Sequence, residues 1–178
     1  SLEEVLDRSN PFKKIIVVRS AVQSREIGHL PGDVGDKMEI YQQPYRQICE
    51  TLFERKDAWN RLEEQGYVEF ISTSFIRGMS FDDAIIIVDE CQNMTYQELD
   101  TVITRVGESS KIIFCGDMKQ DDLKISKHRA DVSGLKDFIR VISKLDDFAV
   151  VEFTTDDIVR SGLVKQYLIA KEKELEVA

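Results

Sequence analysis

Uninterrupted apolar runs constrain the fold of this 178-residue chain more than any other feature of its sequence. The run Ile85-Ile86-Ile87-Val88 does not alternate between apolar and polar side chains, as a strand with one solvated face would. Strands that are apolar on both faces are typical of a parallel sheet with helices packed on either side. Five runs are predicted to be strands: Ile15–Val18, Val68–Ser72, Ala84–Asp89, Lys111–Asp117 and Phe148–Thr154.

The segments between these runs carry apolar residues at helical spacing. Thr95 and Glu98 form the S/T-x-x-E pattern of a capping box, which predicts a helix start, and Gly107 is the expected C-cap of that helix. Alternating strands and helices predict a doubly wound α/β fold, a three-layer sandwich with a mostly parallel sheet, in a single domain of residues 1–178. Three further helices are predicted: Asp36–Arg55, Ser133–Leu145 and Asp156–Glu174, the last interrupted near Ser161-Gly162.

Composition excludes several classes of protein. No apolar run approaches the ~20 residues that a membrane span requires, and the acidic start Ser1–Glu4 does not resemble a signal peptide. The three cysteines, Cys49, Cys91 and Cys115, form neither a CxxC pair nor a Cys/His cluster, so structural zinc is not expected. Reduced thiols and the lack of an export signal predict a cytoplasmic protein.

The run at 84–89 delivers two acidic residues at the edge where sheets of this class bind ligands. An apolar strand followed by Asp and then Glu has the Walker B pattern, in which Asp89 would hold Mg²⁺ beside the phosphates of ATP. Glu90 would orient and deprotonate the attacking water, and Gln92 would contact that water or the γ-phosphate. Taken alone, the same residues also fit a buried strand that ends in solvated acids.

The run at 111–117 ends in a second polar pattern, GDxxQ, formed by Gly116, Asp117 and Gln120. Gly116 permits a sharp exit from the strand, and the Gln120 amide can both donate and accept, as a sensor of the γ-phosphate would. In isolation, an ordinary Gly-Asp turn explains this pattern better. Two such strand ends with one helix between them resemble motifs II and III of superfamily 1 helicases. We therefore expect Asp89, Glu90 and Gln120 to face one magnesium–nucleotide pocket, with Asp117 as a second nucleotide contact.

Longer stretches of the chain resemble the PhoH family. Arg19-Ser20-Ala21-Val22 and Gly28–Asp33 are similar to the family patterns TRPAVE and LGFLPGD, and Lys37 and Tyr41 fit EKVDPYLRPLYDAL. Three later stretches resemble YMRG, DEAQN (with Cys in place of Ala) and FTSEDVVRHPLV: Phe75–Gly78, Asp89–Asn93 and Phe153–Val164. These matches occur in order and cover nearly the whole chain.

The resemblance implies a RecA-like P-loop ATPase that uses ATP and Mg²⁺ and is often linked to RNA or other single-stranded nucleic acid, with homo-oligomeric rings in the family. Arginines of such rings commonly reach the γ-phosphate of a neighbouring site. Arg105 and Arg160 match family positions and are the candidates for this role, while Arg19 is a weaker candidate for nucleotide contact. Alternatively, Arg105 is a cation at a helix C-terminus, and Arg160 pairs with Asp156 or Asp157.

The sequence contains no GxxxxGK[ST] segment, which a P-loop ATPase needs to bind phosphates. In the family this loop lies one helix upstream of the first strand, and Ser1–Leu6 resembles the end of that helix. We expect the missing P-loop strand to lie in the sheet interior, next to the strand at 111–117. We also expect these 178 residues alone to bind ATP weakly or not at all, which calorimetric titration would test.

Two other functions remain open from the residues alone. Acidic clusters also serve two-metal chemistry, so a Mg²⁺-dependent nuclease is an alternative, as is an inactive interaction module. The net charge of 24 − 33 = −9 argues against tight nucleic-acid binding by the bulk surface. A local basic cluster offers either a nucleic-acid contact or a solvated loop: Lys124, Lys127, His128 and Arg129. The nuclease would use four acids: Asp89, Glu90, Asp117 and Asp121.

Overall fold

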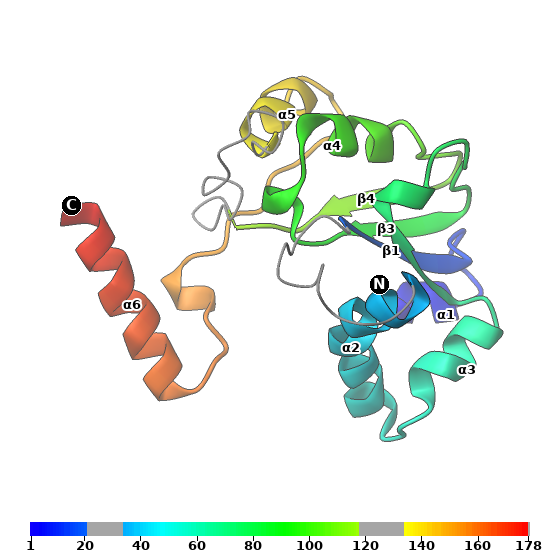
Figure 1. Cartoon of the computed structure of the whole chain (residues 1–178), viewed down its shortest axis with the longest axis horizontal. Coiled ribbons are helices and arrows are strands. Elements are labelled where there is room, and N and C mark those ends of the chain that lie inside the picture. The colour runs from blue at the N-terminus through cyan, green and yellow to red at the C-terminus, as the bar shows by residue number, and fades with distance from the viewer. Residues whose placement is uncertain (21–33, 118–133, 178) are drawn as a thin grey trace. The chain divides into compact units, whose positions relative to one another are not determined.

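The computed structural model describes residues 1–20, 34–117 and 134–177 (Figure 1). The chain divides into two compact units, Ser1–Val141 and Ile142–Ala178. The first unit contains the sheet and the acidic motifs, so most of the functional argument concerns it. The prediction of a single domain over residues 1–178 remains a prediction.

A parallel sheet of four strands forms the centre of the first unit, and it confirms the predicted α/β fold class. The strands pair in the order β2-β1-β3-β4, and every pairing is parallel. Val18 lies opposite Val88, which lies opposite Phe114, so β1, β3 and β4 end at nearly the same level. The strands have these bounds: β1 Lys14–Arg19, β2 Val68–Ser72, β3 Ala84–Val88 and β4 Lys111–Phe114.

Helices cover both faces of this sheet, as expected for strands that are apolar on both sides (Figure 1). On one face, Ile15 and Val17 of β1 belong to a buried cluster with Trp59 and Leu62. On the other face, the Phe138 ring of α5 meets the Phe114 ring of β4 at 4.9 Å. The first face carries α1 Leu2–Leu6, α2 Val34–Phe53 and α3 Ala58–Glu64, and the second carries α4 Tyr96–Ile103 and α5 Leu135–Ile142.

The strand prediction for Phe148–Thr154 is wrong. These residues belong to no helix or strand, and the Val151 and Phe153 side chains are strongly exposed. An apolar run becomes a strand only where a neighbouring strand accepts its backbone hydrogen bonds, and the four described strands pair with one another. The predicted strands at 84–89 and 111–117 are also too long, because β3 ends at Val88 and β4 at Phe114. The polar residues after each of these two strands therefore lie outside the ladder.

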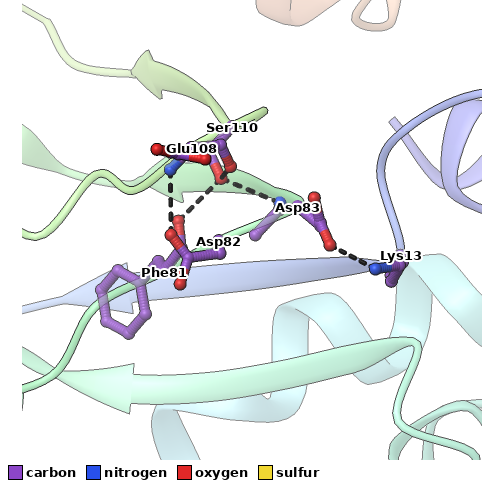
Figure 2. Close-up of polar contacts among 7 residues, drawn as sticks. Lys13, Phe81, Asp82, Asp83, Glu108 and Ser110 are labelled. Carbon is purple, nitrogen blue, oxygen red and sulfur yellow. Dashed lines mark hydrogen bonds and ion pairs between the residues drawn. The ribbon is translucent and has the colours of Figure 1, made fainter.

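A polar network joins the segments that lead into β3 and β4, at the amino ends of the strands (Figure 2). The Ser110 hydroxyl donates to the Phe81 carbonyl at 2.7 Å and accepts from the Ala84 N–H at 3.0 Å. Asp82 Oδ1 accepts from the Glu108 N–H at 2.9 Å, and Lys13 pairs with Asp83. These contacts fix the start of the sheet.

The Gly107 prediction is corrected by the same network. Helix α4 ends earlier, with Thr104 as its C-cap, so Gly107 lies beyond the helix. A Cβ atom at Gly107 would stand 1.8 Å from Asp82 Oδ1. A side chain at this position would displace the Asp82 carboxyl group, which lies against the Gly107 backbone, and no helix ends there.

The second unit contains a short 3-10 helix, η6 Thr155–Asp157, and α6 Gly162–Val177. Thr154 and Asp157 form a capping box in which Asp157 Oδ2 accepts from the Thr154 N–H at 2.7 Å. The start of α6 at Gly162 confirms the predicted interruption near Ser161-Gly162. Within the described ranges, no helix has both the length and the apolar character needed to span a bilayer.

Candidate functional site

Asp89 and Glu90 follow β3 in a tight turn at the carboxyl end of the sheet. The Asp89 N–H donates to the Val18 carbonyl at 3.0 Å, which holds this residue beside the end of β1. Glu90 has φ 54° and ψ 38°, in the left-handed region that costs a non-glycine residue about 1 kcal/mol or more. The short 3-10 helix η3 Cys91–Asn93 begins directly after it. The chain therefore keeps a strained residue at the position predicted to activate water.

Gln92 connects the two predicted motifs. Its side chain is almost fully buried, at 4% exposure, and its Nε2 donates to Glu90 Oε2 at 2.7 Å. Its Oε1 accepts from the Asp117 N–H at 3.2 Å, so one amide contacts both Glu90, after β3, and Asp117, after β4. The structure thus brings Glu90, Gln92 and Asp117 together, as the sequence predicts for neighbouring strand ends.

Gly116 permits this contact through its lack of a side chain. A Cβ atom at Gly116 would lie 2.6 Å from Cys91 Sγ and 2.8 Å from Gln92 Oε1. The backbones are also linked, because the Cys91 N–H donates to the Cys115 carbonyl at 3.0 Å. Close approach of Cys91 and Gln92 thus explains glycine at this position.

Arg19 extends from the end of β1 toward the same acids. Its Nη2 lies 3.8 Å from Glu90 Oε1, and its side chain is 16% exposed. The guanidinium carbon lies 5.7 Å from the centre of the Tyr41 ring on α2, a cation–π distance. Arg19 is therefore held between an aromatic ring and the Glu90 carboxyl group, in a position to meet an anionic ligand.

Tyr45 is a site residue that the sequence did not reveal. Its phenol, one helical turn after Tyr41, donates a hydrogen bond to Asp89 Oδ2. Burial, and then this hydrogen bond to Asp89, raise the pKa of the Tyr45 phenol. Both tyrosines fit the apolar stripe of a predicted helix, so their sequence spacing indicates core packing. Two tyrosines one turn apart are the available signal, since each carries a polar group at its tip.

Glu98 is a second unpredicted link. The capping box with Thr95 is confirmed, because Glu98 Oε2 accepts from the Thr95 N–H at 2.9 Å. Glu98 Oε1 also accepts from Ser20 Oγ at 2.7 Å and from Thr73 Oγ1 at 2.8 Å. Since Ser20 follows β1 and Thr73 follows β2, one carboxyl group joins two strand ends to the start of α4.

Burial disfavours ionisation of the two cysteines beside the site, Cys91 and Cys115. Burial raises the pKa of the Cys91 thiol to about 12, with Cys115 as the next cause. Burial also raises the pKa of Cys115, followed by the effect of Asp89. Because the thiolate is the nucleophile and metal ligand, these shifts favour packing over chemistry for both residues.

Of the two arginines predicted to act on a neighbouring site, Arg105 does not lie beside these acids. Arg105 lies at the end of α4, where its carbonyl accepts from the Phe81 N–H at 2.9 Å. Phe81 precedes β3, so Arg105 is at the amino end of the strands, about 15 Å of strand length from Asp89. Arg160 is exposed on the second unit, and its position relative to Asp89 is not determined.

Several predicted residues lie outside the described ranges. They are Gln120, Asp121 and the basic cluster of Lys124, Lys127, His128 and Arg129. In the part of the chain that is described, no three His, Cys, Asp or Glu side chains are grouped to hold a metal ion. A two-metal nuclease centre therefore has no support among these residues. A single Mg²⁺ held by Asp89 would take its remaining oxygen ligands from phosphate and water.

Comparison with known proteins gives consistent matches. Residues 4–172 match the protein family described as PhoH-like protein. The chain is 34% identical over 169 residues to the PhoH-like protein of Bacillus subtilis (strain 168), covering 94% of this chain and 51% of the relative. It is 34% identical over 162 residues to Protein PhoH of Escherichia coli (strain K12), covering 88% and 44%. The chain thus spans about half the length of these relatives.

Proposed function

Because this chain belongs to the PhoH-like protein family, we propose that it forms part of an ATPase that binds ATP with Mg²⁺ and hydrolyses it. The observation that carries the proposal is the cluster at the carboxyl ends of β1, β3 and β4. There Gln92 bonds to both Glu90 and Asp117, and Arg19 reaches Glu90. Parallel α/β sheets bind ligands at this edge.

The acids suit divided roles in this chemistry. Asp89 offers the hard oxygen that Mg²⁺ prefers, and bound Mg²⁺ would neutralise charge on the phosphates. Glu90 is 40% exposed, so solvent reaches the carboxyl group that would orient and deprotonate the attacking water. Gln92 would hold the Glu90 carboxyl group in that orientation. The backbone bonds of Asp89 and Cys91 would hold the turn itself. Arg19 and Asp117 would contact the nucleotide.

The phosphate loop would come from outside these 178 residues. Strand β4 is at the edge of the described sheet, which is where the P-loop strand is expected to pair. The proposal therefore assigns phosphate binding to a segment elsewhere in the protein and the Mg²⁺ and water to this chain. We also propose that ATP hydrolysis is coupled to RNA or single-stranded nucleic acid and that the full protein assembles into a ring. In that ring, Arg105 and Arg160 would act on a neighbouring site.

Glu90→Gln in the full natural protein tests the proposed function. Removing a general base should lower the kcat of ATP hydrolysis by about 10²-fold or more, while ATP·Mg²⁺ binding persists. Glu64→Gln is the matched control, because Glu64 is exposed on α3. Steady-state hydrolysis and calorimetric ATP binding give the two quantities. A Glu90→Gln protein that turns over ATP within about twofold of wild type would sink the assignment.

A further inference from the structure

Tyr45 reaches the metal-binding carboxyl group from a helix rather than from the sheet. Asp89 is fixed on one side by its backbone bond to Val18, at 3.0 Å. Its side-chain Oδ2 accepts from the Tyr45 phenol, so backbone and side chain are held by different elements. The bond spans 44 positions in sequence, which makes it a tertiary contact between α2 and the end of β3.

The Tyr45 ring is held in place by other aromatic rings. Its centre lies 6.3 Å from that of Trp59 on α3 and 5.8 Å from that of Phe70 on β2, both tilted. Trp59 is only 3% exposed, and Cys49, one turn further along α2, is equally buried. These ring contacts restrict the orientation of the Tyr45 side chain, and its phenol is directed at Asp89.

The geometry has a specific consequence for a metal ion. A carboxyl group at a strand end can rotate about its last bond and present either oxygen or both. The Tyr45 hydrogen bond to Oδ2 favours one rotation of the carboxyl group, and the lone pairs that this bond does not use are left for a cation. Partners of this kind orient metal-ligating carboxylates, and their loss typically weakens metal affinity or activity about 10–100-fold.

We propose that Tyr45 is a positioning residue for the Mg²⁺ site, which acts by fixing the Asp89 carboxyl group through its phenol. This inference rests on the proposed ATPase function. A purely structural explanation also exists, because buried tyrosines usually find a hydrogen-bond partner. The two explanations differ in what they predict for metal dependence, since a packing contact affects stability but not the Mg²⁺ requirement.

The test is Tyr45→Phe in the full natural protein, which removes the hydroxyl and keeps the ring. The Mg²⁺ concentration for half-maximal ATP hydrolysis should rise about tenfold, with kcat at saturating Mg²⁺ within about threefold of wild type. Mn²⁺ titration followed by electron paramagnetic resonance, with ADP present, should show the same loss of affinity. Tyr67→Phe is the matched control, because Tyr67 precedes β2 at the opposite end of the strands.

Each outcome decides the inference. Half-saturation within about twofold of wild type overturns it, as does a Tyr45→Phe protein that unfolds below the assay temperature, because the hydroxyl is then structural. A wild-type protein with no Mg²⁺-dependent nucleotide binding overturns the proposed function and this inference together. Normal Mg²⁺ dependence of wild type with an unchanged Tyr45→Phe variant removes this inference alone.

Discussion

The two ends of the same sheet both gather acidic residues, but they use them differently. At the amino end, Asp82 accepts a backbone N–H and lies against Gly107, and Asp83 pairs with Lys13. At the carboxyl end, Asp89 accepts a hydrogen bond from the Tyr45 phenol. Glu90 accepts one from the Gln92 amide, and the Arg19 guanidinium lies 3.8 Å away. The amino-end acids bond to the segments that lead into the strands, whereas the carboxyl-end acids accept hydrogen bonds from side chains that orient their carboxyl groups. Acid content alone therefore does not identify a site.

The largest expected difference between the two ends is in ATP hydrolysis after an Asp→Asn substitution at each end. Asp89→Asn removes the proposed Mg²⁺ ligand and should lower ATP hydrolysis by about 10²-fold or more, because the metal stabilises transition-state charge by several kcal/mol. Asp83→Asn removes an ion pair whose Lys13 side chain is 76% exposed, so it should leave hydrolysis near wild type. Hydrolysis rates of both variants at saturating Mg²⁺ give the comparison. Equal losses in the two variants would contradict it.

A smaller effect is expected from adding one methyl group at each end. Gly116→Ala would press against Cys91 Sγ at 2.6 Å, and Gly107→Ala against Asp82 Oδ1 at 1.8 Å. Both should lower the free energy of unfolding by about 1–3 kcal/mol, the usual cost of overpacking. Only Gly116→Ala should also reduce ATP hydrolysis, because Gln92 lies within 2.8 Å of the added methyl group. Urea denaturation and hydrolysis of the still-folded proteins separate the two losses.

The smallest expected effect is a pH dependence of stability from the Cys91 thiol at the carboxyl end, and it is absent at neutral pH. Burial raises the pKa of the Cys91 thiol from 9.0 to about 12, so this thiol ionises earlier in the unfolded chain than in the folded one. Its contribution to stability is complete below pH 9 and is lost as the pH rises from 9 toward 12. The gap in urea midpoint between wild type and Cys91→Ala should therefore narrow between pH 8 and pH 10. A constant gap would count against the shift.

The sequence predicted what depends on local pattern. β2 has the predicted bounds, and the capping box at Thr95 is present, because strand burial and helix starts are encoded in neighbouring residues. The approach of Asp117, after β4, to Gln92, after β3, was also predictable, since parallel strands end at one edge. The strand expected at Phe148–Thr154 failed because pairing depends on a neighbour that local sequence does not specify.

The unpredicted part of the site consists of contacts between distant segments. Tyr45 has an ordinary place on an apolar helix face, and nothing near it in sequence indicates that Asp89 is its partner. Glu98 was assigned to a capping box, and its bonds to Ser20 and Thr73 span 78 and 25 positions. Where a side chain makes both a local and a long-range contact, a single sequence indicates only the local contact.

The bonds of Glu98 make three separate parts of the chain mechanically interdependent. Its carboxyl group bonds to Ser20, Thr73 and Thr95, which links the residues that follow β1 and β2 to the first turn of α4. A displacement of any one of these segments is therefore expected to affect the other two. Because α4 follows the Asp89–Gln92 turn by only a few residues, the alignment of that turn is tied to the exits of two strands that carry none of its acids.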